Sequence, residues 1–120
     1  MPPLMSQNRA NPDCLFCKIV AKNLPADIVY EDDWVLAFRD IYPKAETHIL
    51  CVPKKHYETT MDIVPAEAEI FTRLMQGVQK VAETLALDGF KIVINNGKSA
   101  GQIVPHVHIH VLSGRKIKAV

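Results

Sequence analysis

Three histidines alternate with β-branched residues near the C-terminal end of the chain. The sequence PHVHIHVL, residues 105–112, places His106, His108 and His110 one residue apart, with valine or isoleucine between them. Such alternation is typical of a β-strand, whose successive side chains point to opposite faces. The imidazoles are then expected on one face, about 7 Å apart along the strand, while the apolar side chains face a core. Three imidazoles on one face indicate chemistry, because neutral imidazole is a nucleophile and a metal ligand near neutral pH.

A glycine-rich loop directly precedes these histidines. The sequence NNGKSAGQ, residues 95–102, holds two glycines, two asparagines and a serine. Such a loop can direct several backbone N–H groups at one anion, although it lacks the pattern of a Walker loop. Taken alone it could be a plain hairpin connection. Its place before three histidines favours a phosphate cradle.

The third feature that could do chemistry is the C-x-x-C pair formed by Cys14 and Cys17. The pair could be redox-active, could consist of two inert buried thiols, or could supply half of a structural zinc site, which needs two further ligands. No thioredoxin-like βαβ pattern surrounds the pair, and this disfavours the redox interpretation. Cys51 lies inside the apolar run HILCVP and is predicted to be a small buried hydrophobic residue.

Composition limits the classes of protein to which the chain can belong. Its 120 residues fit one domain, 48% are hydrophobic and 22% are charged, and the formal net charge is +1. This balance predicts no nucleic-acid footprint, and no apolar run approaches a membrane span. The odd cysteine count, with no signal peptide, favours a reducing and therefore cytoplasmic location. Residues 1–12 are predicted to be a flexible extension, and residues 13–120 are predicted to form the domain.

Hydrophobic periodicity predicts the elements that must position these residues. A short helix is expected within residues 11–25, with Asp13 as its possible N-cap. Two strands, at 27–32 and 34–41, would be joined by a tight acidic turn. Three further strands are expected at 47–53, 90–95 and 106–112.

A long amphipathic helix is predicted over residues 65–87, with Pro65 in its first turn and Gly89 where it would be ending. Its apolar face recurs every three or four residues, at Ile70, Leu74, Val78, Val81 and Leu85. The order of elements contains no alternating βαβ units. The expected fold class is therefore α+β, with a five-stranded, mostly antiparallel sheet, one long helix and one short helix.

The sequence from His106 to Leu112 resembles the signature of the histidine-triad (HIT) superfamily, in which three histidines alternate with apolar residues. The stretches CLFCKIVAKNLPADIVYEDDWVLAFRDI, THILCVPKKH and FKIVINNGKSAGQ agree in order and spacing, so the resemblance covers roughly residues 13–114. Within the superfamily the chain is most similar to the Hint branch of purine nucleoside phosphoramidate hydrolases. The resemblance implies an α+β homodimer whose sheets join across a two-fold axis, and it implies AMP or GMP conjugates as substrates.

The resemblance also implies roles for individual residues. His108 matches the nucleophile that forms a covalent nucleotidyl-histidine, with the triad residues His106 and His110 beside it and His48 supporting it. The positions that match the phosphate site are Asn95, Gly101, Gln102, His108 and His110. No catalytic metal is implied.

The nucleoside and metal sites can be carried over in the same way. Asp40 matches the acidic residue that binds both ribose hydroxyls, and a carboxylate suits two hydroxyl donors. The matching base slot consists of Leu15, Phe16, Ile19, Phe38 and Ile41. In cysteine-bearing members of the superfamily, the positions of His56 and His106 bind zinc together with the C-x-x-C pair. A structural zinc held by Cys14, Cys17, His56 and His106 is therefore expected.

Two departures from the Hint pattern concern the leaving group. Ile103 stands where these proteins usually have a serine that can assist the leaving group, and the C-terminus SGRKIKAV lacks their usual ending WPPG. A dinucleoside polyphosphate hydrolase and a nucleotide-binding scaffold with little catalysis are therefore alternatives. A hydrolase with all three strand histidines on one catalytic zinc is a further alternative, disfavoured because no acidic residue stands close to them in sequence.

Overall fold

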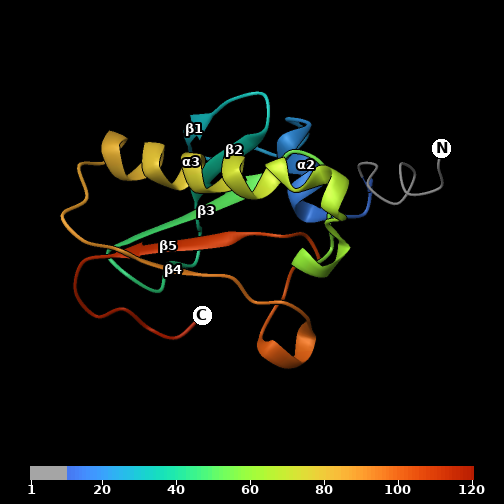
Figure 1. Cartoon of the computed structure of the whole chain (residues 1–120). Helices are drawn as coiled ribbons and strands as arrows, with labels where there is room; N and C mark the ends of the chain where they lie inside the picture. The colour runs from blue at the N-terminus through green and yellow to red at the C-terminus, as the bar shows by residue number, and fades with distance from the viewer. Residues whose placement is uncertain (1–10) are drawn as a thin grey trace.

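The computed structural model describes residues 11–120, which form one five-stranded sheet with two α-helices (Figure 1). The strands are β1 (Ile28–Glu31), β2 (Val35–Arg39), β3 (Thr47–Pro53), β4 (Lys91–Val93) and β5 (Ile109–Ser113). The helices are α2 (Leu15–Val20) and α3 (Glu69–Thr84), with 3-10 turns at Thr60–Asp62, Pro65–Glu67 and Lys98–Ala100. The strand order is β1-β2-β3-β5-β4, and every neighbouring pair is antiparallel. The predicted α+β class is confirmed.

Two further sequence predictions concern the N-terminal extension and membrane-spanning segments. The predicted flexible extension, residues 1–12, lies almost wholly outside the described residues. Within residues 11–120, no helix is both long enough and apolar enough to cross a lipid bilayer.

Alternation along the strands divides the core into two layers, one on each face of the sheet. One face packs against α3 and buries Val35, Ala37, Ile49, Cys51, Val107, Ile109 and Val111. The other face packs against α2 and buries Leu36, Phe38, Leu50 and Val52 together with Phe16 and Ile19. Because side chains in a strand alternate between faces, the residues between Val107, Ile109 and Val111 must lie on the α2 face. The sheet thereby directs the alternating histidines away from α3.

The fifth strand begins later than its sequence predicts. The ladder between β3 and β5 ends with Cys51 opposite Ile109, and its continuation by two residues would set Pro53 against Val107. Proline has no N–H group to donate to a ladder, and Val107 N–H bonds the Tyr57 carbonyl at 2.7 Å instead. The prediction of a strand from residue 106 was wrong, because the chain bends at residues 104–106 and β5 begins at Ile109.

Both helices also differ from prediction at their ends. Cys14, not Asp13, is the N-cap of α2, since its thiol accepts from the Cys17 N–H at 3.4 Å. Pro65 opens a separate 3-10 turn, and α3 itself begins at Glu69. Gly89 does not end α3, because the left-handed residue after the helix is Ala86, with φ +51°.

The long helix lies unusually close to the sheet at Gly77. A Cβ atom at this position would sit 3.0 Å from both the Cys51 Sγ and a Val35 methyl group. Cys51 is fully buried there, and burial raises the pKa of its thiol to about 12. The prediction that Cys51 is a buried packing residue is confirmed.

Candidate active site

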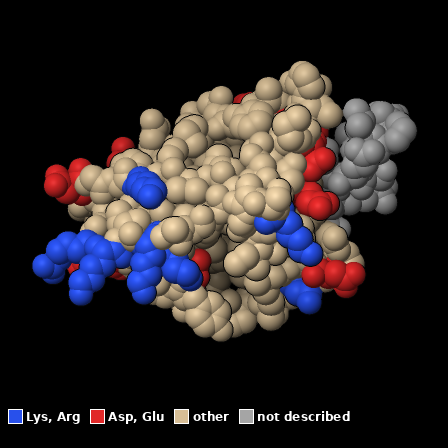
Figure 2. All heavy atoms as spheres, turned by 90° about the horizontal axis from the view of Figure 1, so that it is seen from below, with Lys and Arg blue, Asp and Glu red and all other residues tan. Residues whose placement is uncertain are grey.

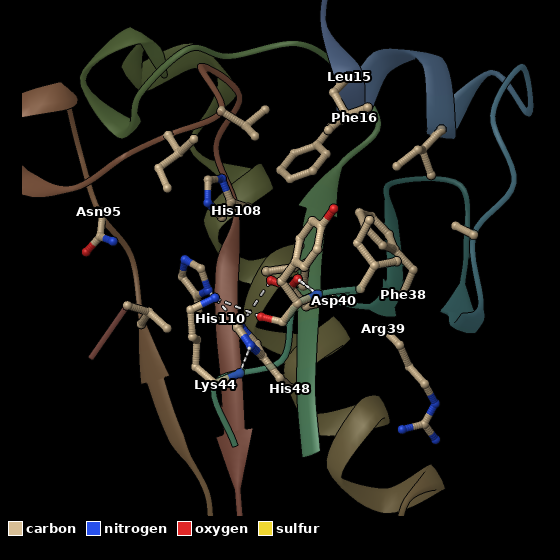
Figure 3. Close-up of a pocket in the computed structure, with 18 of the residues that line it drawn as sticks. Leu15, Phe16, Phe38, Arg39, Asp40, Lys44, His48, Asn95, His108 and His110 are labelled. Carbon is tan, nitrogen blue, oxygen red and sulfur yellow. Dashed lines mark hydrogen bonds and ion pairs between the residues drawn. The ribbon is translucent and has the colours of Figure 1, made fainter. Parts of the chain in front are cut away.

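A pocket of about 490 Å³ opens on the α2 face of the sheet, above β3 and β5 (Figure 3). The predicted residues that line it are Leu15, Phe16, Ile19, Phe38, Asp40, Ile41, His48, Asn95, Gly101, His108 and His110. Three segments far apart in sequence therefore meet here: the N-terminal helix, the β2–β3 region, and the loop and strand that contain the histidines. Gln102, His56 and His106 do not line the pocket.

His108 presents a bare ring nitrogen to this pocket. Its Nδ1 lies 2.7 Å from the His106 carbonyl oxygen, and a carbonyl can only accept. Nδ1 therefore carries the proton, and Nε2 keeps its lone pair. Burial lowers the pKa of His108 below its usual value, and the ring packs edge-on against Phe16 at 5.1 Å. The result is a neutral imidazole held in one tautomer and one orientation.

His48 and His110 form a second imidazole pair whose tautomers are also determined. His48 Nδ1 accepts from the Lys44 backbone N–H at 3.0 Å, so the proton of His48 is on Nε2. That Nε2 donates to His110 Nδ1 at 2.9 Å. His110 must therefore carry its own proton on Nε2, where it can be donated. Burial is the main cause that lowers the pKa of His110 to about 4, so this ring stays neutral.

Asp40 lies in the pocket wall beside this pair. Its Oδ1 accepts from the Tyr42 N–H at 2.8 Å, which forms a tight turn after β2. Its Oδ2 lies 3.5 Å from His48 Nε2. A carboxylate has about four acceptor positions, so acceptor capacity remains for ligand hydroxyl groups.

The loop before β5 adds an unpaired donor to the same pocket. Among the described residues, Asn95 Nδ2 is the buried side-chain polar atom without a hydrogen-bond partner. A buried donor left unpaired costs about 1–3 kcal/mol, which a bound acceptor would relieve. Gly101 lies beside this amide in the left-handed conformation that favours glycine, with φ +96°, and a Cβ there would be in ordinary contact with Nδ2 at 3.6 Å. An acceptor on a bound ligand could therefore pair with this amide.

Gln102 has a different role from the one expected of it. Its Oε1 accepts from the Gly97 N–H at 2.7 Å, and its Nε2 donates to the carbonyls of Glu58 and Val104. All of its hydrogen-bonding groups are therefore engaged with backbone, and the side chain is buried. The side chain of Gln102 therefore holds the loop in shape, and the assignment of this residue to a phosphate site stays a prediction.

A second cluster lies just outside the pocket, where α2 meets the chain before β5. Cys14, Cys17, His56 and His106 are all buried, and their donor atoms lie within 4.8 Å of one another. The His106 Nδ1 is 3.4 and 3.6 Å from the two sulfurs and 3.1 Å from the His56 Nδ1. The His106 Nε2 donates to the Pro53 carbonyl at 2.9 Å, so Nδ1 carries a lone pair that points into the cluster.

These distances can be compared with those of a zinc tetrahedron. With Zn–S near 2.3 Å and Zn–N near 2.0 Å, neighbouring donor atoms lie roughly 3.3–3.8 Å apart. The observed S···N separations fall between 3.3 and 3.6 Å, so the four residues fit a metal of this kind. The His106 ring therefore belongs to the cluster and does not line the pocket. Its backbone carbonyl accepts the hydrogen bond from His108 Nδ1.

Some pocket residues could not be identified by sequence reasoning. Lys44, Tyr42 and Val104 also line the pocket, as does the C-terminal residue Val120. Lys44 follows the turn that Asp40 forms with Tyr42. The sequence offers only its spacing, four residues before His48, as a sign that it belongs to the pocket. The tail reaches the pocket because the Lys118 N–H donates to the Lys44 carbonyl at 2.7 Å, a contact that no local pattern encodes.

Residues 21–117 of the chain match the HIT domain family. The chain belongs to the HIT family. It is 39% identical over 107 residues to the purine nucleoside phosphoramidase of Escherichia coli, and this match covers 88% of the chain and 90% of the relative. The family resemblance predicted from the histidine signature is thereby confirmed.

Solved structures of HIT proteins share the fold. A histidine triad protein from Clostridium difficile superposes with a TM-score of 0.85 at 43% identity, covering 92% of this chain and 97% of that one. A HIT family hydrolase from Clostridium thermocellum gives the same TM-score and coverages at 38% identity. The similarity to these proteins indicates a hydrolase in general.

Proposed function

We propose that the chain hydrolyses purine nucleoside phosphoramidates, or related nucleotide conjugates, at the α-phosphate through a nucleotidyl-His108 intermediate. The observation that carries the proposal is the bare Nε2 of His108, fixed by the bond from its Nδ1–H to the His106 carbonyl. A nucleophile needs a lone pair at the reacting atom and a fixed orientation. Both are present here without any proton transfer from the ring.

The reaction can be followed bond by bond. The His108 Nε2 lone pair forms a bond to the α-phosphorus, the P–N bond to the leaving amine breaks, and the amine takes up a proton. His108 keeps its Nδ1 proton throughout, so the adduct carries a positive ring, which weakens the new P–Nε2 bond. Water then attacks the phosphorus, a P–O bond forms and the P–Nε2 bond breaks. One water proton stays on the new phosphate oxygen and the other replaces the proton that the amine took up, so the nucleotide and neutral His108 are released.

Charge that develops on the phosphate oxygens would meet donors that already point into the pocket. The candidates are the His110 Nε2–H, fixed by the bond from His48, and the unpaired Asn95 amide. Donors fixed before the reaction stabilise a transition state without reorganisation. The apolar slot lined by Phe16 and Phe38 would take the purine, and Asp40 would accept from the ribose hydroxyls.

The test is acid quench during turnover of an AMP phosphoramidate, followed by peptide mass spectrometry. A nucleotidyl group is expected on His108. His108→Gly should lose the adduct and the turnover while AMP binding persists, because the other pocket residues remain. An adduct on another residue, or turnover without any adduct, would reject covalent catalysis by His108.

We also propose that the Cys14, Cys17, His56 and His106 cluster holds a structural zinc ion. The support is the donor set, two thiols and two imidazole nitrogens at tetrahedral separations. The bond from the His106 Nε2 to the Pro53 carbonyl is the kind of outer contact that orients a metal-bound histidine. Zinc there would join α2 to segments 39 and 92 residues away. A reducing, cytoplasmic location would keep the two thiols available.

Elemental analysis of protein purified without added metal tests the zinc proposal. About one zinc per chain is expected, with loss in Cys14→Ser and no loss in Cys51→Ser, whose thiol lies on the other face of the sheet. Zinc content that does not change in Cys14→Ser would mean that the thiols only pack. Reversible loss of all turnover on stripping, with the fold intact, would favour a catalytic zinc.

The expected homodimer is a proposal that rests on the free edge of the sheet. β4 ends the strand order, and it pairs with β5 alone among the described strands. Phe90, Ile92 and Ile94, in and beside β4, are between 37 and 44% exposed. An exposed apolar edge strand invites pairing, and pairing with its own copy joins two sheets. Light scattering should give twice the chain mass, and Ile92→Lys should reduce it toward the monomer mass.

A further inference from the structure

One cation in the pocket has no part in the function proposed so far. Lys44 lines the pocket and is partly buried. Its ammonium group donates to the Tyr42 carbonyl at 2.8 Å, a neutral acceptor. None of the ion pairs among residues 11–120 includes Lys44. A cation directed into a pocket without a carboxylate partner is available to an anionic ligand.

The backbone of Lys44 is held from both sides. Its N–H donates to the His48 Nδ1 at 3.0 Å, and its carbonyl accepts from the Lys118 N–H at 2.7 Å. The first bond ties Lys44 to the imidazole pair, and the second ties it to the C-terminal tail, whose last residue, Val120, lines the pocket. Lys44 is thus a built part of the pocket wall, in contrast to a surface lysine that happens to lie nearby.

Figure 3 shows where along the pocket this lysine lies. Leu15 and Phe16 stand at one end, Lys44 stands at the other, and His108 and His110 lie between them. Figure 3 shows Lys44 and His110 side by side at this end, and the positive charge of Lys44 is among the causes that, after burial, lower the pKa of His110. If the purine occupies the apolar end, Lys44 lies beyond the phosphate, on the side away from the base.

Further cations lie near this end of the pocket, where the Asp40 carboxylate also lies and Glu46 pairs with Arg115 of the tail. Lys116 and Lys118 belong to the tail that contacts Lys44, and their side chains are exposed. Figure 2 shows a cluster of Lys and Arg side chains at the margin of the face that carries this tail. Such a cluster raises the local concentration of anions.

We propose that Lys44 binds an anionic group of the leaving group, a carboxylate or a phosphate that lies beyond the scissile bond. This inference rests on the proposed function, since it assigns the substrate class to the same site. Substrates whose leaving group carries such an anion would be preferred over otherwise equal neutral ones. The apolar Ile103 at the pocket mouth offers no competing polar contact there.

The experiment compares three substrates that share AMP. Two are phosphoramidates, of β-alanine and of β-alanine amide, which differ by one carboxylate. The third is diadenosine tetraphosphate, whose leaving group carries phosphates. Each is assayed with the unchanged chain, Lys44→Gln, Lys44→Arg, and the matched control Lys80→Gln, whose side chain is exposed on α3.

In Lys44→Gln, the ratio of kcat/KM for the carboxylate to that for the amide should fall about tenfold, the usual effect of one hydrogen bond between charged groups. Lys44→Arg should restore most of the ratio, Lys80→Gln should leave it unchanged, and added salt should shrink the effect. The same loss on the tetraphosphate alone would support the proposal with phosphate as the anion.

Two outcomes would overturn the proposal. The ratios could stay unchanged in Lys44→Gln for both anionic substrates, or kcat/KM could fall equally for all three, which would place Lys44 on the scissile phosphate. Trapping the nucleotidyl-His108 adduct with the neutral amide tests the proposed function separately, because that substrate has no anion for Lys44. A trapped adduct with unchanged ratios would therefore reject only the role of Lys44.

Discussion

Replacing Asp40 with asparagine changes one oxygen of the pocket and leaves its shape nearly the same. The carbonyl of the new side-chain amide can still accept from the Tyr42 N–H, which Asp40 Oδ1 accepts at 2.8 Å. The amide nitrogen would replace Oδ2, the oxygen 3.5 Å from the His48 Nε2. If both ribose hydroxyls donate to this carboxylate, the substitution converts charge-assisted hydrogen bonds into neutral ones.

The magnitude follows from the difference between the two kinds of bond. A hydrogen bond to a charged group contributes about 1.5–3 kcal/mol, and a neutral one contributes about 0.5–1.5 kcal/mol. The loss is therefore about 1 kcal/mol for each hydroxyl and about 2 kcal/mol for the ribose. Since about 1.4 kcal/mol is a factor of ten, the Kd for AMP should rise roughly 30-fold.

Isothermal titration with AMP and with its 2′,3′-dideoxy analogue measures this effect without turnover. The Asp40→Asn variant should bind AMP more weakly, while its affinity for the dideoxy analogue should barely change. Asp33→Asn is the matched control, because Asp33 is exposed and lies outside the pocket. An equal loss of affinity for both ligands would refute a role for Asp40 at the ribose.

Three further predictions concern the core, the metal and the pH dependence. Gly77→Val should lower the free energy of unfolding by about 1–3 kcal/mol, since overpacking of a tight core costs this much, and urea titration measures it. Cys17→Ser should lower the melting temperature in calorimetry yet keep turnover at low temperature, because the cluster lies outside the pocket; turnover that vanishes together with the zinc would contradict this. The rate should stay constant from pH 8 to below pH 6.5 and fall only at lower pH. The reason is that burial depresses the pKa of both His108 and His110 and the reaction needs their neutral forms; an acid limb centred above pH 6.5 would contradict this effect of burial.

The sequence allowed the sheet and its two faces to be predicted because alternation is a local signal. The five strands were found near their predicted positions, and the apolar face of α3 was predicted correctly from its period. The ends of elements were predicted less well, because they depend on contacts with other segments. The late start of β5 depends on Pro53, which lies more than 50 residues earlier and would face Val107 if the ladder continued.

The site residues that could be predicted are those that match the family's sequence motifs. The histidines, Asp40 and the four members of the metal cluster were each named from the sequence, and the structure gathers them into the pocket and the cluster beside it. The bond from the Gln102 amide to the Glu58 carbonyl could not be predicted, since nothing local indicates a partner 44 residues away. Lys44 could not be predicted as a pocket residue, because its position depends on the folded pocket and on its contact with the C-terminal tail.

The strict alternation of the strands has a consequence for insertions and deletions in this gene. A shift of one residue in a strand moves every side chain to the opposite face. In β5 such a shift would exchange His110 with Val111, so that an imidazole would enter the α3 core and a valine would face the pocket. The packing of the core and the arrangement of the pocket would then be lost together. Changes in length should therefore be tolerated only in the connections, and the termini of β3 and β5 should mark the boundaries of that tolerance.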